Sequence, residues 1–412
     1  MNLTPESTRP YPSMKNPLTV IFTAIALDAV GIGLIFPILP NLLQQLTHTS
    51  NVAPYIGITT ALYAIMQFIF SPVLGALSDR LGRRPVLLLS LGGAAISYLF
   101  MAFATQLWML LLGRAIAGLT SANMAVATAY ITDISPENKR AGRFGIFNAM
   151  FGIGFIIGPV LGGLLGDYWL RLPFLVAAGL NIGNMLLALL VLPESRKPQP
   201  GRFNLAALNP LQPMQWAFTR KSLLPLIAAF FVFSFSGEAY GVCWALWGHD
   251  TFQWNGSWIG LSLGAFGLCQ ALVQAFLTGR VVRLLGERRT LFTGLACACL
   301  ALLVMALAHH SWLIFVIMPV FALGGIGTPA LQSLATRQVS TEQQGQFQGV
   351  LAAVISASAI IGPLVFSAIY FLVRQQWPGA IWLAVIGIYL FIVPVVIRLG
   401  LNKTGTGAAN TP

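Results

Sequence analysis

The stretch "GALSDRLGRRPVLL", residues 75–88, places four charged side chains between two long apolar runs. These side chains are Asp79, Arg80, Arg83 and Arg84. Across the 412 residues, hydrophobic residues make up 57% and charged residues only 8%, with a mean hydropathy of +0.78. A soluble protein carries roughly 25% charged residues, so this chain belongs in a lipid bilayer.

Working outward from this stretch, the sequence predicts about twelve membrane-spanning helices, because a helix needs about 20 apolar residues to cross the hydrocarbon core. Strands of a membrane barrel would alternate polar and apolar residues. The apolar runs do not alternate, so the predicted fold class is an all-α membrane protein. The expected spans lie near 18–40, 54–77, 86–104, 107–131, 143–165, 172–192, 223–247, 257–278, 290–308, 311–335, 346–372 and 378–400.

The net charge of +12 follows the predicted topology. If the amino terminus is cytoplasmic, 20 of the 23 Lys and Arg fall on the cytoplasmic side, while Arg171 and Arg374 fall outside and Arg114 lies within a helix. This bias matches the positive-inside rule, so we expect both termini in the cytoplasm. The basic excess is a topology signal and gives no support for nucleic-acid binding.

Nothing in the sequence predicts an enzyme, a metal or a cofactor. No nucleophile–base pair or phosphate loop stands in a suitable context, and the cysteine spacing matches no metal or disulfide pattern. The cysteines are expected to pack as small apolar residues inside helices, and they are Cys243, Cys269, Cys297 and Cys299. The histidines are expected in loops near the periplasmic face, and they are His48, His249, His309 and His310.

The chain divides into two similar halves. A polar segment containing "PESRKPQPGRFN" separates six expected helices from six more, which predicts domains at 1–192 and 223–412 joined by a cytoplasmic linker at 193–222. "GALSDRLGRRPVL" from Gly75 resembles "GRVVRLLGERRTL" from Gly279, and "FIIGPVLGG" resembles "AIIGPLVFS", each at an offset of 204. "SPENKRAGRFG" and "STEQQGQFQG" match at nearly the same offset. Duplicated six-helix halves are typical of secondary transporters, whose binding site lies near midplane between the halves.

The opening stretch also resembles the signature loop between helices 2 and 3 of the major facilitator superfamily. "LLLGRAIAGL", with Arg114 and Gly118, resembles its helix 4 signature. "GIGFIIGPVLGG" resembles the helix 5 motif of the drug/proton antiporter branch. Longer stretches such as "LDAVGIGLIFPILP" are similar to tetracycline-class efflux proteins over nearly the whole chain. The matching positions are Gly75, Asp79, Arg80, Gly82, Arg83, Arg84 and Pro85 in the loop, and Gly154, Gly158, Pro159, Gly162 and Gly163 in helix 5.

The resemblance implies a secondary transporter of the bacterial inner membrane that exports a drug-like amphiphile, with tetracyclines as candidates, in exchange for protons. Its expected partners are that small molecule, protons and the bilayer, and it is expected to act as a monomer. Three positions depart from the efflux proteins, since Ser97, Gln270 and Ala298 stand where those carry an acid, a His and an Asp. A proton-coupled importer of a nutrient is the alternative, and a membrane enzyme, a channel or a receptor is disfavoured.

Three ionisable residues are predicted to act in proton coupling, because a charge at the bilayer centre costs about 2.5–3.5 kcal/mol and marks a functional candidate. Asp28 lies roughly 15 Å into the first helix, where burial favours a carboxyl that takes up and releases a proton. Glu238 is a second deep acid or a counter-charge for cationic drugs. The resemblance implies that Arg114 takes part in proton transfer or holds helices 1 and 4 together. The alternatives are a silent polar pairing of Asp28 and a hydrated, inert Glu238.

The loop charges and the helix 5 glycines have predicted conformational roles. The resemblance implies that the loop charges form a cytoplasmic latch that holds the halves closed. The alternative is that these charges only determine the membrane topology. Small residues in helix 5 allow close helix packing, and Pro159 bends the helix. The alternative to a conformational role is ordinary helix packing, which is compatible with both features. The predicted latch consists of Gly75, Asp79, Arg80, Gly82, Arg83, Arg84 and Asp133.

Substrate contacts are predicted at polar and aromatic positions of the expected spans. Gln270 and Gln274 lie four apart and share one helix face. Aromatic side chains suit flat lipophilic molecules and cations. The predicted contacts are Gln67, Tyr63, Asn123, Asn148, Gln270, Gln274, Tyr240 and Trp244, with Phe151, Phe155, Phe230, Phe231 and Trp247 as further aromatic candidates.

Overall fold

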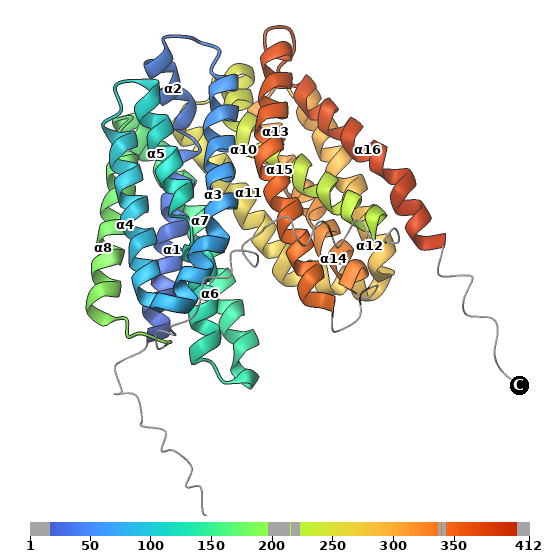
Figure 1. The fold of residues 1–412 in the computed structure, drawn as a ribbon. Helices are drawn as coiled ribbons and strands as arrows, with labels where there is room; N and C mark the ends of the chain where they lie inside the picture. The colour runs from blue at the N-terminus through green and yellow to red at the C-terminus, as the bar shows by residue number, and fades with distance from the viewer. Residues whose placement is uncertain (1–16, 197–214, 216–222, 337–338, 340–342, 402–412) are drawn as a thin grey trace, which may run out of the picture.

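The computed structural model describes residues 17–196, 215, 223–336, 339 and 343–401, and it is built of helices throughout these residues (Figure 1). Most of the predicted linker 193–222 lies outside the described residues, so the domain bounds stay a prediction. The first half contains α1 (Pro17–Ile35), α2 (Leu39–Thr47), α3 (Ala53–Leu81), α4 (Arg83–Ala102), α5 (Leu107–Leu119), α6 (Asn123–Ile134), α7 (Glu137–Tyr168) and α8 (Leu172–Val191). The second half contains α10 (Leu224–Phe252), α11 (Gly256–Leu272), η2 (Val273–Leu277), α12 (Thr278–Leu307), α13 (Ser311–Gly324), α14 (Gly327–Thr336), α15 (Gln344–Val373) and α16 (Ala380–Leu401).

The number of spans is consistent with the sequence. Within the described residues, ten helical segments are long and apolar enough to cross a membrane. One of them, Gly256–Leu307, has 52 residues and is broken at Gly286 inside α12. Counting both sides of Gly286, together with the apolar stretch Ala380–Phe391 of α16, accounts for the twelve expected spans.

Four of the expected spans are interrupted or distorted, which the sequence did not predict. The first span breaks between α1 and α2 at Pro37, whose nitrogen cannot donate a hydrogen bond. The fourth breaks between α5 and α6, and the tenth between α13 and α14. The eighth passes through the π-helix η2. Non-helical backbone at membrane depth is tolerated where it is buried in protein or lines a cavity.

The packing of the halves follows a two-fold pattern. Within each half the first helix packs on the fifth, α1 on α7 and α10 on α15. Across the interface α3 packs on α15 and α11 packs on α7. In the duplication α3 corresponds to α11 and α7 corresponds to α15. The α3–α15 contact of the interface is therefore the counterpart of the α11–α7 contact. Figure 1 shows the blue-to-green half beside the yellow-to-red half.

Two glycines support the duplication at the level of the backbone. Gly82 has φ 105° and ψ 160°, and Gly286, 204 positions later, has φ 76° and ψ 162°. Among the described residues these are the glycines with positive φ. A residue without a Cβ adopts this conformation readily, so the same turn ends α3 and breaks α12.

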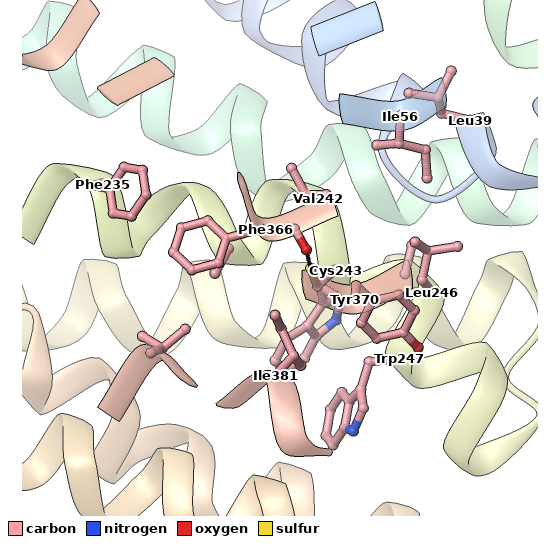
Figure 2. Close-up of a cluster of buried hydrophobic side chains, with 14 of the residues drawn as sticks. Leu39, Ile56, Phe235, Val242, Cys243, Leu246, Trp247, Phe366, Tyr370 and Ile381 are labelled. Carbon is pink, nitrogen blue, oxygen red and sulfur yellow. Dashed lines mark hydrogen bonds between the residues drawn. The ribbon is translucent and has the colours of Figure 1, made fainter. Parts of the chain in front are cut away.

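The second half has an aromatic core where α10, α15 and α16 meet (Figure 2). Trp247, Phe366, Tyr370 and Ile381 are fully buried there. Cys243 lies among them, and its thiol contacts the carbonyl oxygen of Phe366 at 3.7 Å. Cys243 therefore packs as the small apolar residue that the sequence predicted.

Candidate functional site

A central cavity lies between the two halves and has two adjoining lobes. We call them the polar lobe, of about 180 Å³, and the aromatic lobe, of about 550 Å³. The halves both contribute to it, since α1 and α3 face α10 across the cavity. The residues that line both lobes are Phe36, Thr60, Gly241, Val242 and Ala245.

Asp28 is held in the polar lobe by a hydrogen bond. It extends from α1 and is 8% exposed. The side-chain amide of Asn123, at the start of α6, donates to Asp28 Oδ1 at 2.8 Å. The break between α5 and α6 therefore positions the partner. Asn123 is uncharged, so this bond orients the carboxyl group without neutralising it.

Arg114 brings a positive charge into the polar lobe from α5. In the described part of the chain no ion pair joins it to Asp28, and its buried Nε has no hydrogen-bond partner. Tyr63 also lines this lobe and shares a 3.0 Å hydrogen bond with Ser121. Both roles expected for Arg114, in proton transfer and in holding helices 1 and 4 together, stay predictions.

The aromatic lobe is built by α7 of the first half and by α10, α11 and η2 of the second. The Tyr240 and Phe266 rings are nearly parallel, with centroids 6.4 Å apart, and Trp244 lies 6.1 Å from Tyr240. Polar side chains are few in this lining. The predicted residues that line it are Phe151, Phe155, Glu238, Tyr240, Trp244, Gln270 and Gln274.

Several predicted contacts are not brought to the cavity. Trp247 is fully buried in the aromatic core, and Phe230 and Phe231 are not among the lining residues of either lobe. Gln67 does not line the polar lobe. Its side-chain amide donates a 2.8 Å hydrogen bond to Ser121, which does. Asn148 is exposed on α7 and lines neither lobe.

The structure adds residues that the sequence analysis missed. Thr60, Tyr98 and Ser121 line the polar lobe. Ser121 lies in the non-helical link between α5 and α6, where "TSAN" interrupts an apolar run at residues 120–123. A cluster of small polar residues inside an expected span is the signal that could have identified it.

Two of the three departures from the resemblance line the cavity, and the third lies outside it. Ser97 lines the polar lobe and Gln270 lines the aromatic lobe. Ala298 lies outside both lobes and packs on Gly324, where a Cβ added to the glycine would lie 2.8 Å from that of Ala298. This pair brings α12 and α13 into close contact.

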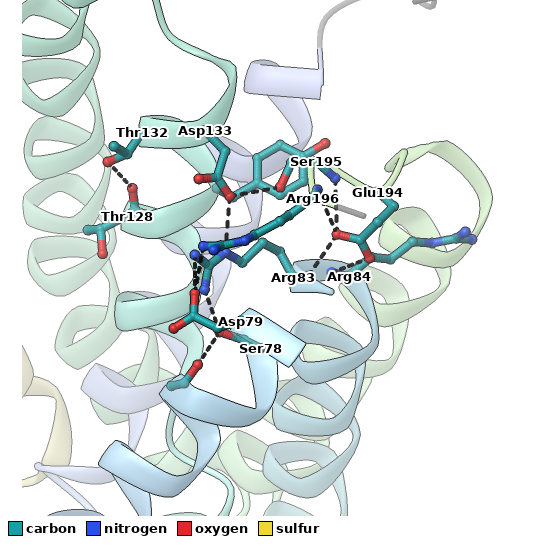
Figure 3. Close-up of polar contacts among 12 residues, drawn as sticks. Ser78, Asp79, Arg83, Arg84, Thr128, Thr132, Asp133, Glu194, Ser195 and Arg196 are labelled. Carbon is teal, nitrogen blue, oxygen red and sulfur yellow. Dashed lines mark hydrogen bonds and ion pairs between the residues drawn. The ribbon is translucent and has the colours of Figure 1, made fainter. Parts of the chain in front are cut away.

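Arg83 is the centre of a polar network at one end of the first half (Figure 3). Its guanidinium lies 2.7 Å from Asp79 and 3.0 Å from Asp133, and it donates to the Ser78 hydroxyl at 2.7 Å. These contacts stay within the first half in this conformation. The pairing of Arg83 with Asp133 is observed, whereas the role of these residues as a latch between the halves stays a prediction.

The halves close against each other at the end opposite this network. Asp167 near the end of α7 accepts backbone hydrogen bonds from Gly256 at 2.9 Å and Ser257 at 2.8 Å, at the start of α11. Arg374, after α15, donates to the carbonyl of Ser50 at 2.7 Å and contacts Asp250 at 2.9 Å. The Asp167 hydrogen bonds and the Arg374–Ser50 hydrogen bond join the first half to the second, whereas the contact with Asp250 lies within the second half.

The helix 5 glycines place α7 directly on its neighbours. A Cβ at Gly154, Gly158 or Gly162 would meet the backbone of α1. A Cβ at Gly163 would meet the backbone of Gly256 in α11. These glycines therefore permit contact both within the first half and across the interface.

Two packed helical halves, a cavity between them and a buried acid at membrane depth define a secondary transporter. Residues 21–257 and 231–410 match the family described as Major Facilitator Superfamily. The chain belongs to this family of transporters, as its motifs predicted, and it is a multi-pass membrane protein and not an enzyme.

Named relatives extend over the whole fold. The chain is 45% identical over 383 residues to "Tetracycline resistance protein, class C" of Escherichia coli, covering 93% of this chain and 97% of that one. It is 41% identical over 385 residues to the class G protein of Vibrio anguillarum, covering 93% and 98%. The crystal structure of nucleoside transporter NupG superposes with a TM-score of 0.76 at 16% identity, covering 93% and 100%, which shows a shared fold.

Proposed function

We propose that this transporter exports a drug-like amphiphilic small molecule, with tetracyclines among the candidates, in exchange for protons. The observation that carries the proposal is the pairing of the two lobes, since a buried acid lies in one and aromatic rings line the other. The relatives named for tetracycline resistance support export over import of a nutrient.

The exchange follows from alternating access. In the state open to the cytoplasm, substrate enters the aromatic lobe and Asp28 releases its proton. After the halves rock, a proton from outside neutralises Asp28 and the substrate leaves. A ligand shifts such an equilibrium only by its differential affinity for the two states, so the proton and the substrate must favour different ones.

The setting of the transporter is part of the proposal. The excess of Lys and Arg on one side of the predicted topology supports both termini in the cytoplasm, and the bacterial relatives support the inner membrane. The cavity is formed by the two halves of a single chain, which supports function as a monomer in the bilayer.

The test uses inside-out vesicles that hold a respiration-driven proton gradient, read with a pH-sensitive dye. A drug panel that includes tetracycline with magnesium is added to wild type, to Asp28→Asn and to Glu137→Gln, an exposed acid at the start of α7. We expect substrate-triggered proton release in wild type and Glu137→Gln, and none in Asp28→Asn at normal expression.

Two results would contradict the proposal. Full proton release by Asp28→Asn would remove Asp28 from coupling. Proton release that requires substrate loaded inside the vesicles, and never follows its external addition, would instead indicate a symporter, which is the behaviour of a nutrient importer.

A further inference from the structure

The segment 279–289, between the expected spans 257–278 and 290–308, is strongly basic. The chain turns there at Gly286, in the middle of α12. Under the predicted topology the segment lies on the cytoplasmic side, at the level where these spans leave the bilayer. Its arginines are all exposed, and they are Arg280, Arg283, Arg288 and Arg289.

The matching segment of the first half has a different charge pattern. At the offset of 204, Arg283 stands where the first half has Asp79, the acid that pairs with Arg83 at 2.7 Å. Arg280 and Arg289 stand where the first half has uncharged residues. We call Arg280, Arg283 and Arg289 the arginine patch. At this patch the duplicated segment has gained positive charges and lost the acid that pairs with an arginine in the first half.

No acidic side chain of the described residues pairs with the arginine patch. Arg283 donates to the carbonyl of Gly279, in its own helix, at 3.3 Å. Glu287 is the acid of the segment, and it accepts a 2.5 Å hydrogen bond from Ser333 on α14. This carboxylate therefore contacts the body of the second half. The patch keeps its positive charge for a ligand from outside the described chain.

Exposed apolar side chains lie beside the patch. Leu284, the neighbour of Arg283, is 83% exposed, and Phe276, one turn before Arg280, is 59% exposed. Such side chains are costly in water but are stable beside acyl chains, while arginine head groups reach the lipid phosphates. The combination of charged and apolar side chains favours a lipid as the ligand over a soluble acidic partner, which would offer nothing to the apolar side chains.

We propose that the arginine patch binds the phosphate of an anionic phospholipid in the cytoplasmic leaflet. Guanidinium groups bind phosphate through paired N–H donors, and basic residues at this level attract the anionic lipids of that leaflet. The acyl chains of the bound lipid lie along the exposed apolar side chains at the same end of α12. This site lies outside the central cavity, so it does not depend on which substrate is exported.

The experiment measures lipid retention by the purified full-length chain in native mass spectrometry. The chain in detergent is mixed with equal amounts of dioleoylphosphatidylglycerol, an anionic lipid, and dioleoylphosphatidylcholine, which has no net charge. We expect wild type to retain the anionic lipid preferentially. Arg283→Gln should weaken its binding by about fivefold, the contribution of one basic residue near an anionic membrane surface. Combining Arg283→Gln with Arg280→Gln and Arg289→Gln should remove the preference.

The controls separate a built site from a general effect of charge. Retention of the neutral lipid should be the same in every variant, which shows that each is folded. Lys139→Gln removes an exposed positive charge near the start of α7, on the same predicted side, and should keep the full preference.

Four results would overturn the proposal. They are equal retention of both lipids by wild type, an unchanged preference in the triple variant, an equal loss of preference in Lys139→Gln, and displacement of the anionic lipid by inorganic phosphate at matched ionic strength. The last result would indicate a site for a soluble anion instead of a lipid.

Discussion

Asn123 is the residue through which the polar lobe controls Asp28. It donates the hydrogen bond that orients the buried carboxyl group at 2.8 Å, and it lines the polar lobe and not the aromatic one. We expect Asn123→Ala to slow substrate-triggered proton release by about tenfold, because a hydrogen bond to a charged group contributes roughly 1.5–3 kcal/mol. The vesicle dye assay measures this rate.

A binding measurement separates this effect from general damage. The affinity in nanodiscs for the compound that triggers proton release in the vesicle panel should be unchanged in Asn123→Ala, since the aromatic lobe keeps its lining. A parallel loss of binding and of proton release would mean that Asn123 supports the fold of the cavity instead of the proton site.

At the scale of the residue, the sequence showed which polar side chains lie inside the predicted spans. It did not show which of them point toward the cavity. A charge or an amide inside an apolar run must lie deep, which identified Asp28, Arg114 and Glu238. The direction of a side chain depends on how its helix is rotated against its neighbours. Asn148 and Gln270 are similar residues in predicted spans, yet one is exposed on α7 and the other lines the aromatic lobe.

At the scale of the element, α7 depends on glycine where it crosses α1. A Cβ at Gly158 would lie 2.7 Å from the carbonyl oxygen of Val30 and 2.9 Å from the Cα of Gly33, and these backbone atoms cannot move aside as a flexible side chain does. We expect Gly158→Ala to destabilise the protein by about 1–3 kcal/mol, the usual cost of overpacking. The midpoint of thermal unfolding in detergent measures this loss.

Gly145→Ala is the matched control on the same helix. A Cβ at Gly145 would meet nothing within 4 Å, and Ala favours a helix over Gly by about 1 kcal/mol. The unfolding midpoint should therefore stay the same or rise. A fall of equal size in both variants would show that the glycines matter for a reason other than the α1–α7 contact.

Periodicity and composition predicted the spans but not their breaks. Periodicity and composition describe how apolar a segment is. They do not say whether the helix is continuous through that segment. Pro37 carries a visible signal for the break after α1, but the break at Thr120–Ala122 has neither Pro nor Gly within it. The position of Asn123 beside Asp28 depends on that break, so this contact could not be predicted from the sequence.

At the scale of the whole molecule, two contacts close one end of the transporter. Asp167 extends from the end of α7 to the start of α11, and Arg374 extends from the end of α15 to the segment before α3. The duplication relates α7 to α15 and α11 to α3, so the two contacts occupy equivalent places in the two halves. One uses a carboxylate that accepts backbone N–H groups, and the other uses a guanidinium that donates to a backbone carbonyl. In the amino-terminal half of α7, a Cβ at Gly142, Gly145 or Gly152 would meet nothing within 4 Å. The structure is therefore closed at the Asp167 end.

Asp167→Asn should shift the molecule away from this state. The carboxylate accepts two backbone N–H groups at the positive end of α11, and its loss should raise the population open at this end by about tenfold, the equivalent of roughly 1.4 kcal/mol. Hydrogen exchange followed by mass spectrometry measures the shift, with Glu137→Gln as control. Exchange should rise at residues 256–259 and fall at residues 142–152, because opening one end closes the other. Faster exchange at residues 256–259 alone would mean that Asp167 only caps α11 and does not hold the halves together.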